Sequence, residues 1–191
     1  MCIGEIVKLV TSFLIPVVLL IGVSAQAGPS DFHAGELLPE FGKIASVDMD
    51  QTVRARAKFK VAFDVGQRTE AGTLNRKLES AARFLNMHAA AGVKPKNIKL
   101  AIVLHGGAAR DVTRAAYYAA SLKDDETKLE NANVALVQAL IDNGVEFYVC
   151  GQTAAYYGIK NEDLLPGVHM ALSAMTAHAL LQQDGYTLNP F

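Results

Sequence analysis

Cysteine is nearly absent from this sequence of 191 residues, where only Cys2 and Cys150 occur. Cys2 lies in an N-terminal segment that we expect to be removed, so one thiol remains. A single thiol excludes an internal disulfide, and the lack of a C-x-x-C motif excludes dithiol exchange within one chain. An unpaired thiol either reacts with a partner molecule or is a small buried apolar residue, and composition alone favours the buried residue.

Long apolar runs are lacking after the first 27 residues. Lys8 is followed by an apolar stretch over residues 9–23 and then by the small residues of Ser24–Ala27, which is the layout of a cleaved secretory signal. Pro16 interrupts the stretch, and its length falls short of the ~20 residues of a membrane-spanning helix, so an uncleaved anchor is the less favoured alternative. We predict cleavage after Ala27, a periplasmic or otherwise exported location, and a mature chain without a membrane span.

An excess of charge of one sign is also missing, because 18 Lys and Arg residues face 19 Asp and Glu residues. The basic residues are scattered along the chain and form no stripe of the kind that nucleic acid requires. Phosphate-binding, dinucleotide-binding and nucleophile-elbow motifs are absent. The histidines show no metal-ligand spacing, which leaves a metal or haem site of His105, His169 and His178 as a minor alternative. We expect no nucleic-acid partner, no metal and no cofactor.

The sequence does contain a regular alternation of strand and helix patterns. Alternating or β-branched segments predict strands over residues 59–66, 98–104, 145–149, 168–172 and about 186–188, and helical spacing covers residues 74–91, 115–121, 133–143 and about 174–183. This alternation predicts an α/β domain over residues 57–191, with a five-stranded parallel sheet and helices on both faces. Residues 28–56 form an N-terminal arm that packs on the domain or on a neighbour, and the charged run 123–128 is interpreted as a solvated loop or a lid.

Polar side chains follow the predicted strands at their carboxyl ends, where ligands gather in open parallel sheets. These residues are Asp64, His105, Cys150 and Ser173. His105 either tunes the thiol or binds a substrate oxyanion, or it only donates a hydrogen bond to a backbone carbonyl at the sheet edge. Asp64 is interpreted as a turn or helix-capping group. His178, on the last helix, is interpreted as a packed or subunit-contact histidine.

Cys150 has the strongest physical argument for a function. The residues after it open a short helix, and the free N–H groups at a helix N-terminus stabilise a thiolate. Thr153 either donates to the sulfur or only caps the helix, and capping is the favoured interpretation. The glycines after His105 allow a close approach of the backbone to a ligand. The candidate site residues are Cys150 and His105 as reactive groups, and Gly106, Gly151, Gln152 and Thr153 as substrate-binding groups.

The Cys150-Gly151-Gln152 element and its surroundings resemble the DsrE/DsrF-like proteins, especially their secreted branch. The resemblance runs from about Lys58 to the C-terminus and includes His105-Gly106, the helix from Asn133, the turn at Leu165–Gly167 and the segment Ala171–Met175. It implies a three-layer α/β/α domain that assembles into homo-oligomers. It also implies that Cys150 stands where the active members of the family carry sulfur as a persulfide.

Together, the residues and the resemblance predict an exported sulfur carrier, in which the Cys150 thiolate accepts sulfane sulfur and His105 assists. The sulfur donor and the acceptor are unknown, and an exported location excludes the cytoplasmic tRNA-thiolation apparatus as the acceptor. The alternative is a non-catalytic oligomeric binding or scaffold protein in which Cys150 is buried and inert.

Overall fold

A five-stranded, all-parallel sheet forms the centre of the computed structural model, which describes residues 28–123 and 128–190. The strands are β1 (Phe59–Val65), β2 (Ile98–Leu104), β3 (Glu146–Cys150), β4 (Val168–Ala171) and β5 (Thr187–Asn189). Their order across the sheet is β4-β3-β2-β1-β5, and every neighbouring pair is parallel. The predicted fold class is confirmed. The predicted signal segment 1–27 and most of the charged run 123–128 lie outside the described residues.

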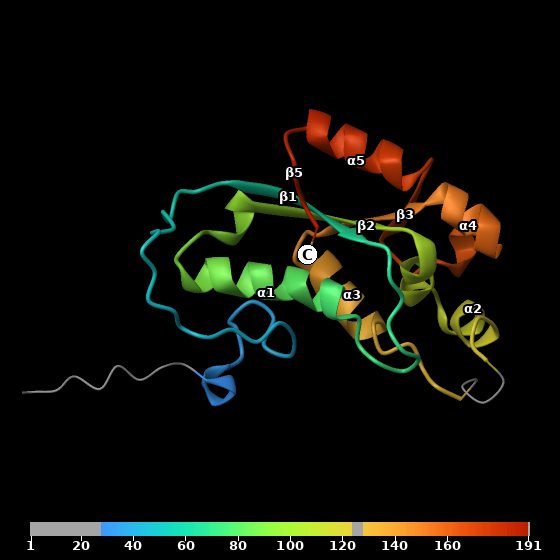
Figure 1. The fold of residues 1–191 in the computed structure, drawn as a ribbon, viewed down its shortest axis with the longest axis horizontal. Coiled ribbons are helices and arrows are strands. Elements are labelled where there is room, and N and C mark those ends of the chain that lie inside the picture. The colour runs from blue at the N-terminus through green and yellow to red at the C-terminus, as the bar shows by residue number, and fades with distance from the viewer. Residues whose placement is uncertain (1–27, 124–127, 191) are drawn as a thin grey trace, which may run out of the picture.

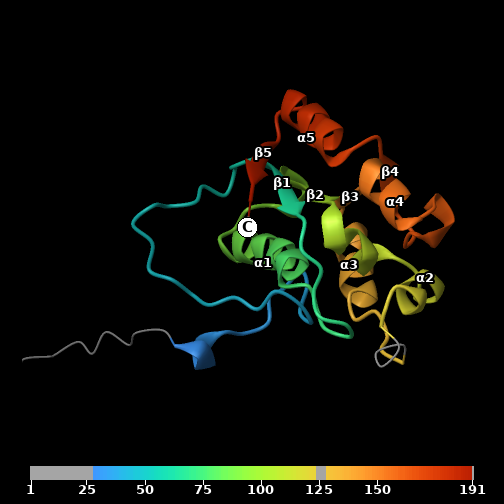
Figure 2. The same ribbon diagram turned by 45° about the vertical axis from the view of Figure 1, so that its right-hand side comes forward.

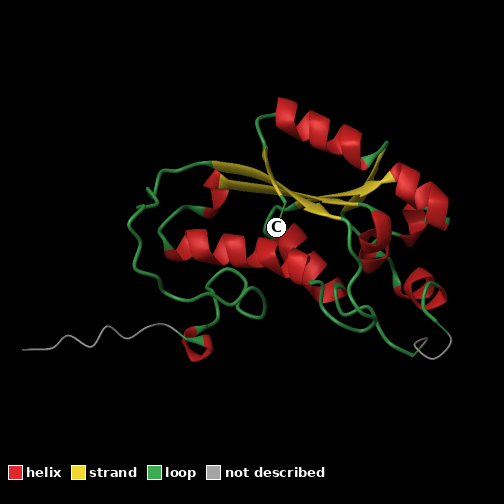
Figure 3. Cartoon of the chain, in the orientation of Figure 1, coloured by secondary structure: helices red, strands yellow, loops and turns green. Residues whose placement is uncertain are grey.

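Helices cover both faces of the sheet (Figures 1 and 3). The helices are α1 (Arg76–Ala90), α2 (Ala115–Ala120), α3 (Val134–Asp142), α4 (Gly151–Tyr157) and α5 (Ala174–Gln183), with short 3-10 turns η1 (Pro29–Asp31), η2 (Pro95–Asn97), η3 (Gly106–Val112) and η4 (Asn161–Asp163). Helices α1 and α3 pack below the sheet in Figure 1 and α5 lies above it, while α2 and α4 stand at the carboxyl end of the strands. Figure 2 shows the same three layers from another side. No helix in the described parts of the chain is long and apolar enough to cross a membrane.

The pleat of β1 explains the two unequal layers. Val61, Phe63 and Val65 point to the main core under α1 and α3, whereas Ala62 points to the smaller core under α5. Each fully buried large side chain, such as Phe63, contributes about 1.5–3 kcal/mol of burial free energy. The small side chain of Ala62 lets α5 lie close to the sheet.

The N-terminal arm packs on its own domain, through α1. Leu38 is buried, and the side chain of Asn86 on α1 donates to the carbonyl oxygens of Leu38, Phe41 and Gly42 at 2.9–3.1 Å. The Asn86 amide oxygen accepts from the Leu38 N–H at 3.0 Å. These bonds satisfy arm backbone groups that would otherwise be buried without partners.

A buried network of polar side chains fixes the loops at the carboxyl end of the sheet. Asn75 caps α1, and its amide donates to Asp111 Oδ2 at 2.8 Å. Asn133 accepts from the Asn75 N–H at 2.7 Å, and Asn131 donates to the carbonyl oxygens of Asp111 and Thr113. The predicted helix 74–91 therefore begins later than expected, because Asn75 is its cap.

Candidate functional site

Cys150 is the last residue of β3 and the N-cap of α4, so the thiol lies at the carboxyl end of the sheet. Only 7% of the residue is exposed. Gly151 is required beside it, since a Cβ there would lie 2.5 Å from the Ala171 carbonyl oxygen and 3.0 Å from that of Leu172. The Gln152 side chain also donates to the Leu172 oxygen, at 3.2 Å. The start of α4 is thus held closely against the segment that joins β4 to α5.

Hydrogen bonds to the sulfur outweigh its burial. Burial raises the pKa of the Cys150 thiol, but bonds from the Thr153 N–H and hydroxyl, and from the N–H groups of Ala174 and Gln152, lower that pKa below its ordinary value. The donors come from the first turns of two helices, α4 and α5, where backbone N–H groups are unpaired. The arrangement makes the thiolate easier to form than in a free cysteine.

Thr153 connects the thiol to the loop after β2. Its hydroxyl lowers the pKa of Cys150 and accepts a hydrogen bond from the Gly106 N–H at 3.2 Å. The interpretation of Thr153 as the helix cap is wrong, because Cys150 holds the N-cap position. Gly106 has a φ of +49°, and a Cβ at this position would lie 2.9 Å from the Gly66 carbonyl oxygen. Both features require glycine. The close approach of Gly106 to the Gly66 backbone therefore holds the fold together as well as placing the Gly106 N–H beside Thr153.

His105 follows β2, which lies next to β3 as the sequence argument required. Its ring leans the other way, onto β1, because a Cβ on Gly66 would lie only 2.6 Å from His105 Cε1. The ring is hydrogen-bonded through Nε2 to Asp64 Oδ2 at 3.2 Å, and not to a backbone carbonyl as one interpretation proposed. The hydrogen bonds described for the thiol come from Thr153 and from backbone N–H groups instead.

Asp64 bridges two histidines and is not a turn or capping group. Its Oδ1 is 2.8 Å from His178 Nε2, and its Oδ2 is 3.2 Å from His105 Nε2. Burial raises the pKa of Asp64, but the hydrogen bonds to His178 and His105 and the electrostatic interaction with both rings outweigh that effect and hold the pKa below its ordinary value. His178 is therefore a packed histidine with a defined partner, which ties α5 to β1. We call these three side chains the Asp64 cluster.

The remaining candidates have structural positions. Ser173 caps α5 by accepting from the Thr176 N–H at 3.0 Å. His169 lies on β4 beside Tyr148, with ring centroids 6.1 Å apart, away from the Asp64 cluster. Within the described residues, no group of three or more His, Cys, Asp or Glu side chains is arranged to hold a metal ion. The site is therefore organised around a thiol and its hydrogen-bond donors.

Sequence reasoning missed the Ala174 N–H and the Asp64 cluster. Ser173-Ala174 begins a helix directly after a strand, which was a usable signal for a second set of free N–H groups near the thiol. The Asp64–His178 contact spans 114 positions of sequence. Only the order of the strands brings these two residues together.

The model of the DsrE/DsrF-like family matches residues 60–190. Two solved structures are similar. The protein of unknown function MTH1491 from Methanobacterium thermoautotrophicum has a TM-score of 0.52 at 19% identity, covering 70% of this chain and 100% of that one. The YchN protein from E. coli has a TM-score of 0.49 at 15% identity, with 70% and 99% covered. A search of curated proteins finds no match. At this identity the likeness to MTH1491 supports the α/β fold alone.

Proposed function

The chain belongs to the DsrE/DsrF-like family, and from this premise we propose that it is a sulfur carrier that holds sulfane sulfur as a persulfide on Cys150. The observation that supports this function best is the position of the thiol at the start of α4. Donors from Thr153, Gln152 and Ala174 lower the pKa of Cys150 although the residue is buried. A thiol that served packing alone would need no such donors, because burial by itself favours the neutral form.

The transfer follows from thiolate chemistry. The Cys150 thiolate attacks the outer sulfur of a donor persulfide, a new S–S bond forms, and the donor S–S bond breaks. The donor leaves as a thiolate with the electron pair of that bond, so the step needs neither an oxidant nor a reductant. An acceptor thiolate then attacks the outer sulfur of the Cys150 persulfide and regenerates the Cys150 thiolate. The N–H groups at the two helix starts stabilise the anion before and after transfer.

The His105 imidazole has a supporting role in this proposal. It stands after β2 beside the end of β3, and the Gly106 N–H that follows it binds the hydroxyl that bonds to the sulfur. His105 therefore acts on the thiol through the loop and Thr153. This differs from the sequence-based hypothesis of direct assistance by the imidazole.

Donor and acceptor need an approach to the sulfur, and the elements next to Cys150 carry exposed apolar side chains. Tyr156, Leu172 and Met175 are 83%, 72% and 80% exposed, and all three lie on α4, on α5 or on the loop before α5. Large apolar side chains that are exposed on adjoining elements support a protein interaction surface in this region. We include self-association and docking of a partner protein here in the proposal. Sedimentation of wild type and of Met175→Glu tests it, with dissociation of a wild-type oligomer as the expected result.

Mass spectrometry tests the sulfur carrier directly. The protein is reduced, incubated with inorganic polysulfide and digested, and the Cys150 peptide is expected to gain the mass of one sulfur atom. Dithiothreitol removes a persulfide sulfur, and Cys150→Ser gains nothing. The proposal fails if no sulfur is added while iodoacetamide alkylates Cys150 under the same conditions.

One observation favours the alternative of a binding or scaffold protein with an inert cysteine, namely that only 7% of Cys150 is exposed. The two functions differ in the pH dependence of alkylation. A sulfur carrier gives an apparent thiol pKa below the ~8.5 of a free cysteine. An inert cysteine is not alkylated until the protein unfolds.

Export through a cleaved segment 1–27 is also part of the proposal, since the apolar stretch ends at the small residues of Ser24–Ala27. Expression of the full chain followed by N-terminal sequencing of the mature protein tests it, with Gly28 as the expected first residue. A protein that retains its N-terminus would overturn the proposed cleavage and would leave the proposed role of Cys150 unaffected.

A further inference from the structure

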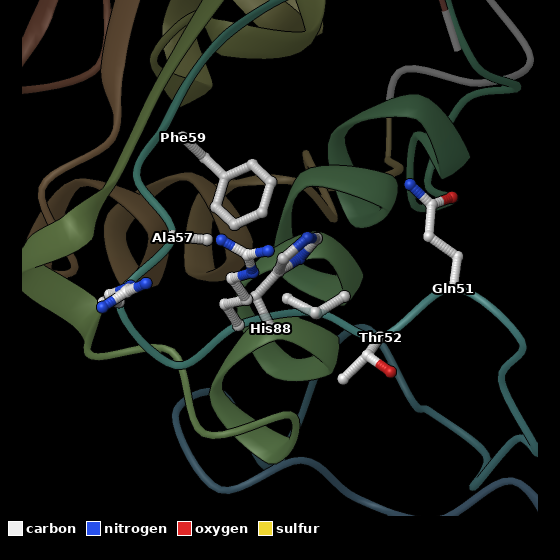
Figure 4. A pocket seen from close by; sticks show the side chains of 8 residues that line it. Gln51, Thr52, Ala57, Phe59 and His88 are labelled. Atoms are coloured by element: carbon white, nitrogen blue, oxygen red, sulfur yellow. The ribbon is translucent and has the colours of Figure 1, made fainter.

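A hollow of about 590 Å³ lies at the amino end of the sheet, far along the strands from the thiol. It is lined by residues of the segment 51–57 and by Phe59 and His88 (Figure 4). Its volume is in the range of pockets that bind small organic ligands, ~300–1,000 Å³. None of the candidate residues around Cys150 takes part in it.

Two guanidinium groups border this hollow without an acidic partner. Arg54 and Arg56 both line it, and no Asp or Glu residue does. Within the described parts of the chain, neither arginine belongs to an ion pair. Asp48 and Asp50 precede the hollow in sequence and are exposed outside its lining. The hollow is therefore more positive than a chain of nearly balanced charge leads one to expect.

Aromatic rings form a preformed wall of the hollow. The Phe59 and His88 ring centroids are 4.4 Å apart at an interplanar angle of 66°. The His88 ring is fixed from behind, because it stacks on Phe84 at 3.9 Å and its Nδ1 bonds to the Phe84 carbonyl oxygen at 2.7 Å. Binding of a flat ligand group on this wall would cost little protein conformational entropy, because the rings are already fixed.

The positive charge continues into a second hollow of about 610 Å³, which shares Phe59 with the first. This second hollow is lined by Lys58, Lys60, Lys96 and Lys99. Lys60 and Lys99 stand in register on neighbouring strands, an arrangement that is unfavourable for like charges. Lys60 and Lys99 also border a third hollow that contains Glu146 and Asp184, whereas Lys58 and Lys96 line only the second of these three hollows.

We infer that the first hollow binds a small organic anion in which a phosphate or carboxylate group is joined to a flat ring. The planar fork of an arginine matches both oxyanions with paired hydrogen bonds. The ring packs against Phe59 and His88, and Lys58 and Lys96 extend the positive field toward further anionic groups. This site is separate from Cys150 and does not depend on sulfur transfer.

Calorimetric titration of the protein with AMP, phthalate, adenosine and pyrophosphate tests the inference, because these probes separate the ring from the anion. We expect AMP or phthalate to bind at least about tenfold more tightly than adenosine, and to bind more weakly at high salt. Tighter AMP than phthalate identifies a phosphate ligand, and the reverse identifies a carboxylate. Equal affinities for AMP and adenosine, equal affinities for AMP and pyrophosphate, or no binding of either anionic ring would overturn the inference.

Matched variants locate the binding. Arg54→Gln and Arg56→Gln are each expected to weaken the binding of the anionic ring compound by roughly tenfold, since each removes charge-assisted hydrogen bonds. Lys160→Gln removes the same charge from an exposed residue outside the hollow, whose partner is Glu162, and is expected to bind as wild type does. Equal weakening by all three variants would show that overall charge is responsible and would refute the site. Thermal unfolding of each variant establishes that it is folded, and Cys150→Ser is expected to bind as wild type does.

Discussion

Gly151→Ala is expected to destabilise the protein and to slow the reaction of its thiol. The added Cβ would lie 2.5 Å from a backbone carbonyl oxygen of Ala171, where ordinary contacts begin at 3.4 Å. Relief requires a displacement of about 0.9 Å between α4 and the segment before α5. Overpacking of this kind costs about 1–3 kcal/mol. For a chain of this size, about 2 kcal/mol lowers Tm by roughly 4–8 °C.

The same displacement moves the Ala174 N–H away from the sulfur. If the hydrogen bonds to the thiolate weaken by about 1 kcal/mol, the rate of alkylation near neutral pH falls roughly fivefold. Thermal unfolding followed by circular dichroism measures the first effect, and the rate of iodoacetamide labelling of the folded protein measures the second.

Gly158→Ala is the matched control at the other end of the same helix. Gly158 has a φ of +70°, and a Cβ there meets nothing within 4 Å. This variant should lose about 1–2 kcal/mol through its left-handed backbone and keep the alkylation rate of wild type. If Gly151→Ala matched wild type in Tm and in alkylation rate, the proposed dependence of the thiol on this close packing would be refuted.

Three further changes test other contacts. Thr153→Val removes the hydroxyl that bonds to the sulfur, so it should raise the pKa of Cys150 in an alkylation–pH profile, whereas Thr153→Ser should stay near wild type. Because Asp64 has a lowered pKa in the fold, its stabilisation is complete above its ordinary value of 3.8 and is lost as pH falls through the lower folded pKa. Urea unfolding at acidic pH should therefore show a smaller loss of stability in Asp64→Asn than in wild type. Asn86→Ala should cost about 2–4 kcal/mol in urea unfolding and expose the arm to proteases, whereas Asn143→Ala, which removes one exposed bond to the Ala139 oxygen, should cost well under 1 kcal/mol.

Local pattern was sufficient to predict most of the fold. The buried run at Ile98–Leu104 and the helix Ala174–Gln183 have the predicted bounds, because apolar periodicity and a capping serine define them within a few residues. The strand before Cys150 begins and ends one residue later than predicted, at Glu146 and Cys150. This shift places the thiol within the sheet edge and not in a loop beyond it.

The candidate site was predictable where it depends on neighbours in sequence. The free N–H groups that follow Cys150 were expected from the start of a helix, and they do lower the pKa of the thiol. The partner of His105 was not predictable, because a histidine after a strand has the same local sequence whether it turns toward β3 or toward β1. The steric space above Gly66 and the carboxylate of Asp64 decide that orientation. The hollow that Arg54 and Arg56 border was also missed, because only the fold brings this part of the chain beside Phe59 and His88.

The position of β5 has a consequence for how the chain folds. The four strands β1 to β4 lie in sequence order across the sheet, but β5 returns to the outer edge of β1. A chain that emerges from its N-terminus can pair the first four strands while its end is still being made, and β1 keeps an open edge until the last residues arrive. Such an edge attracts other extended chains. Aggregation during synthesis should therefore depend on how soon Thr187–Asn189 is released, and a chain that stops before this strand should aggregate even though the thiol and every residue that bonds to it are present.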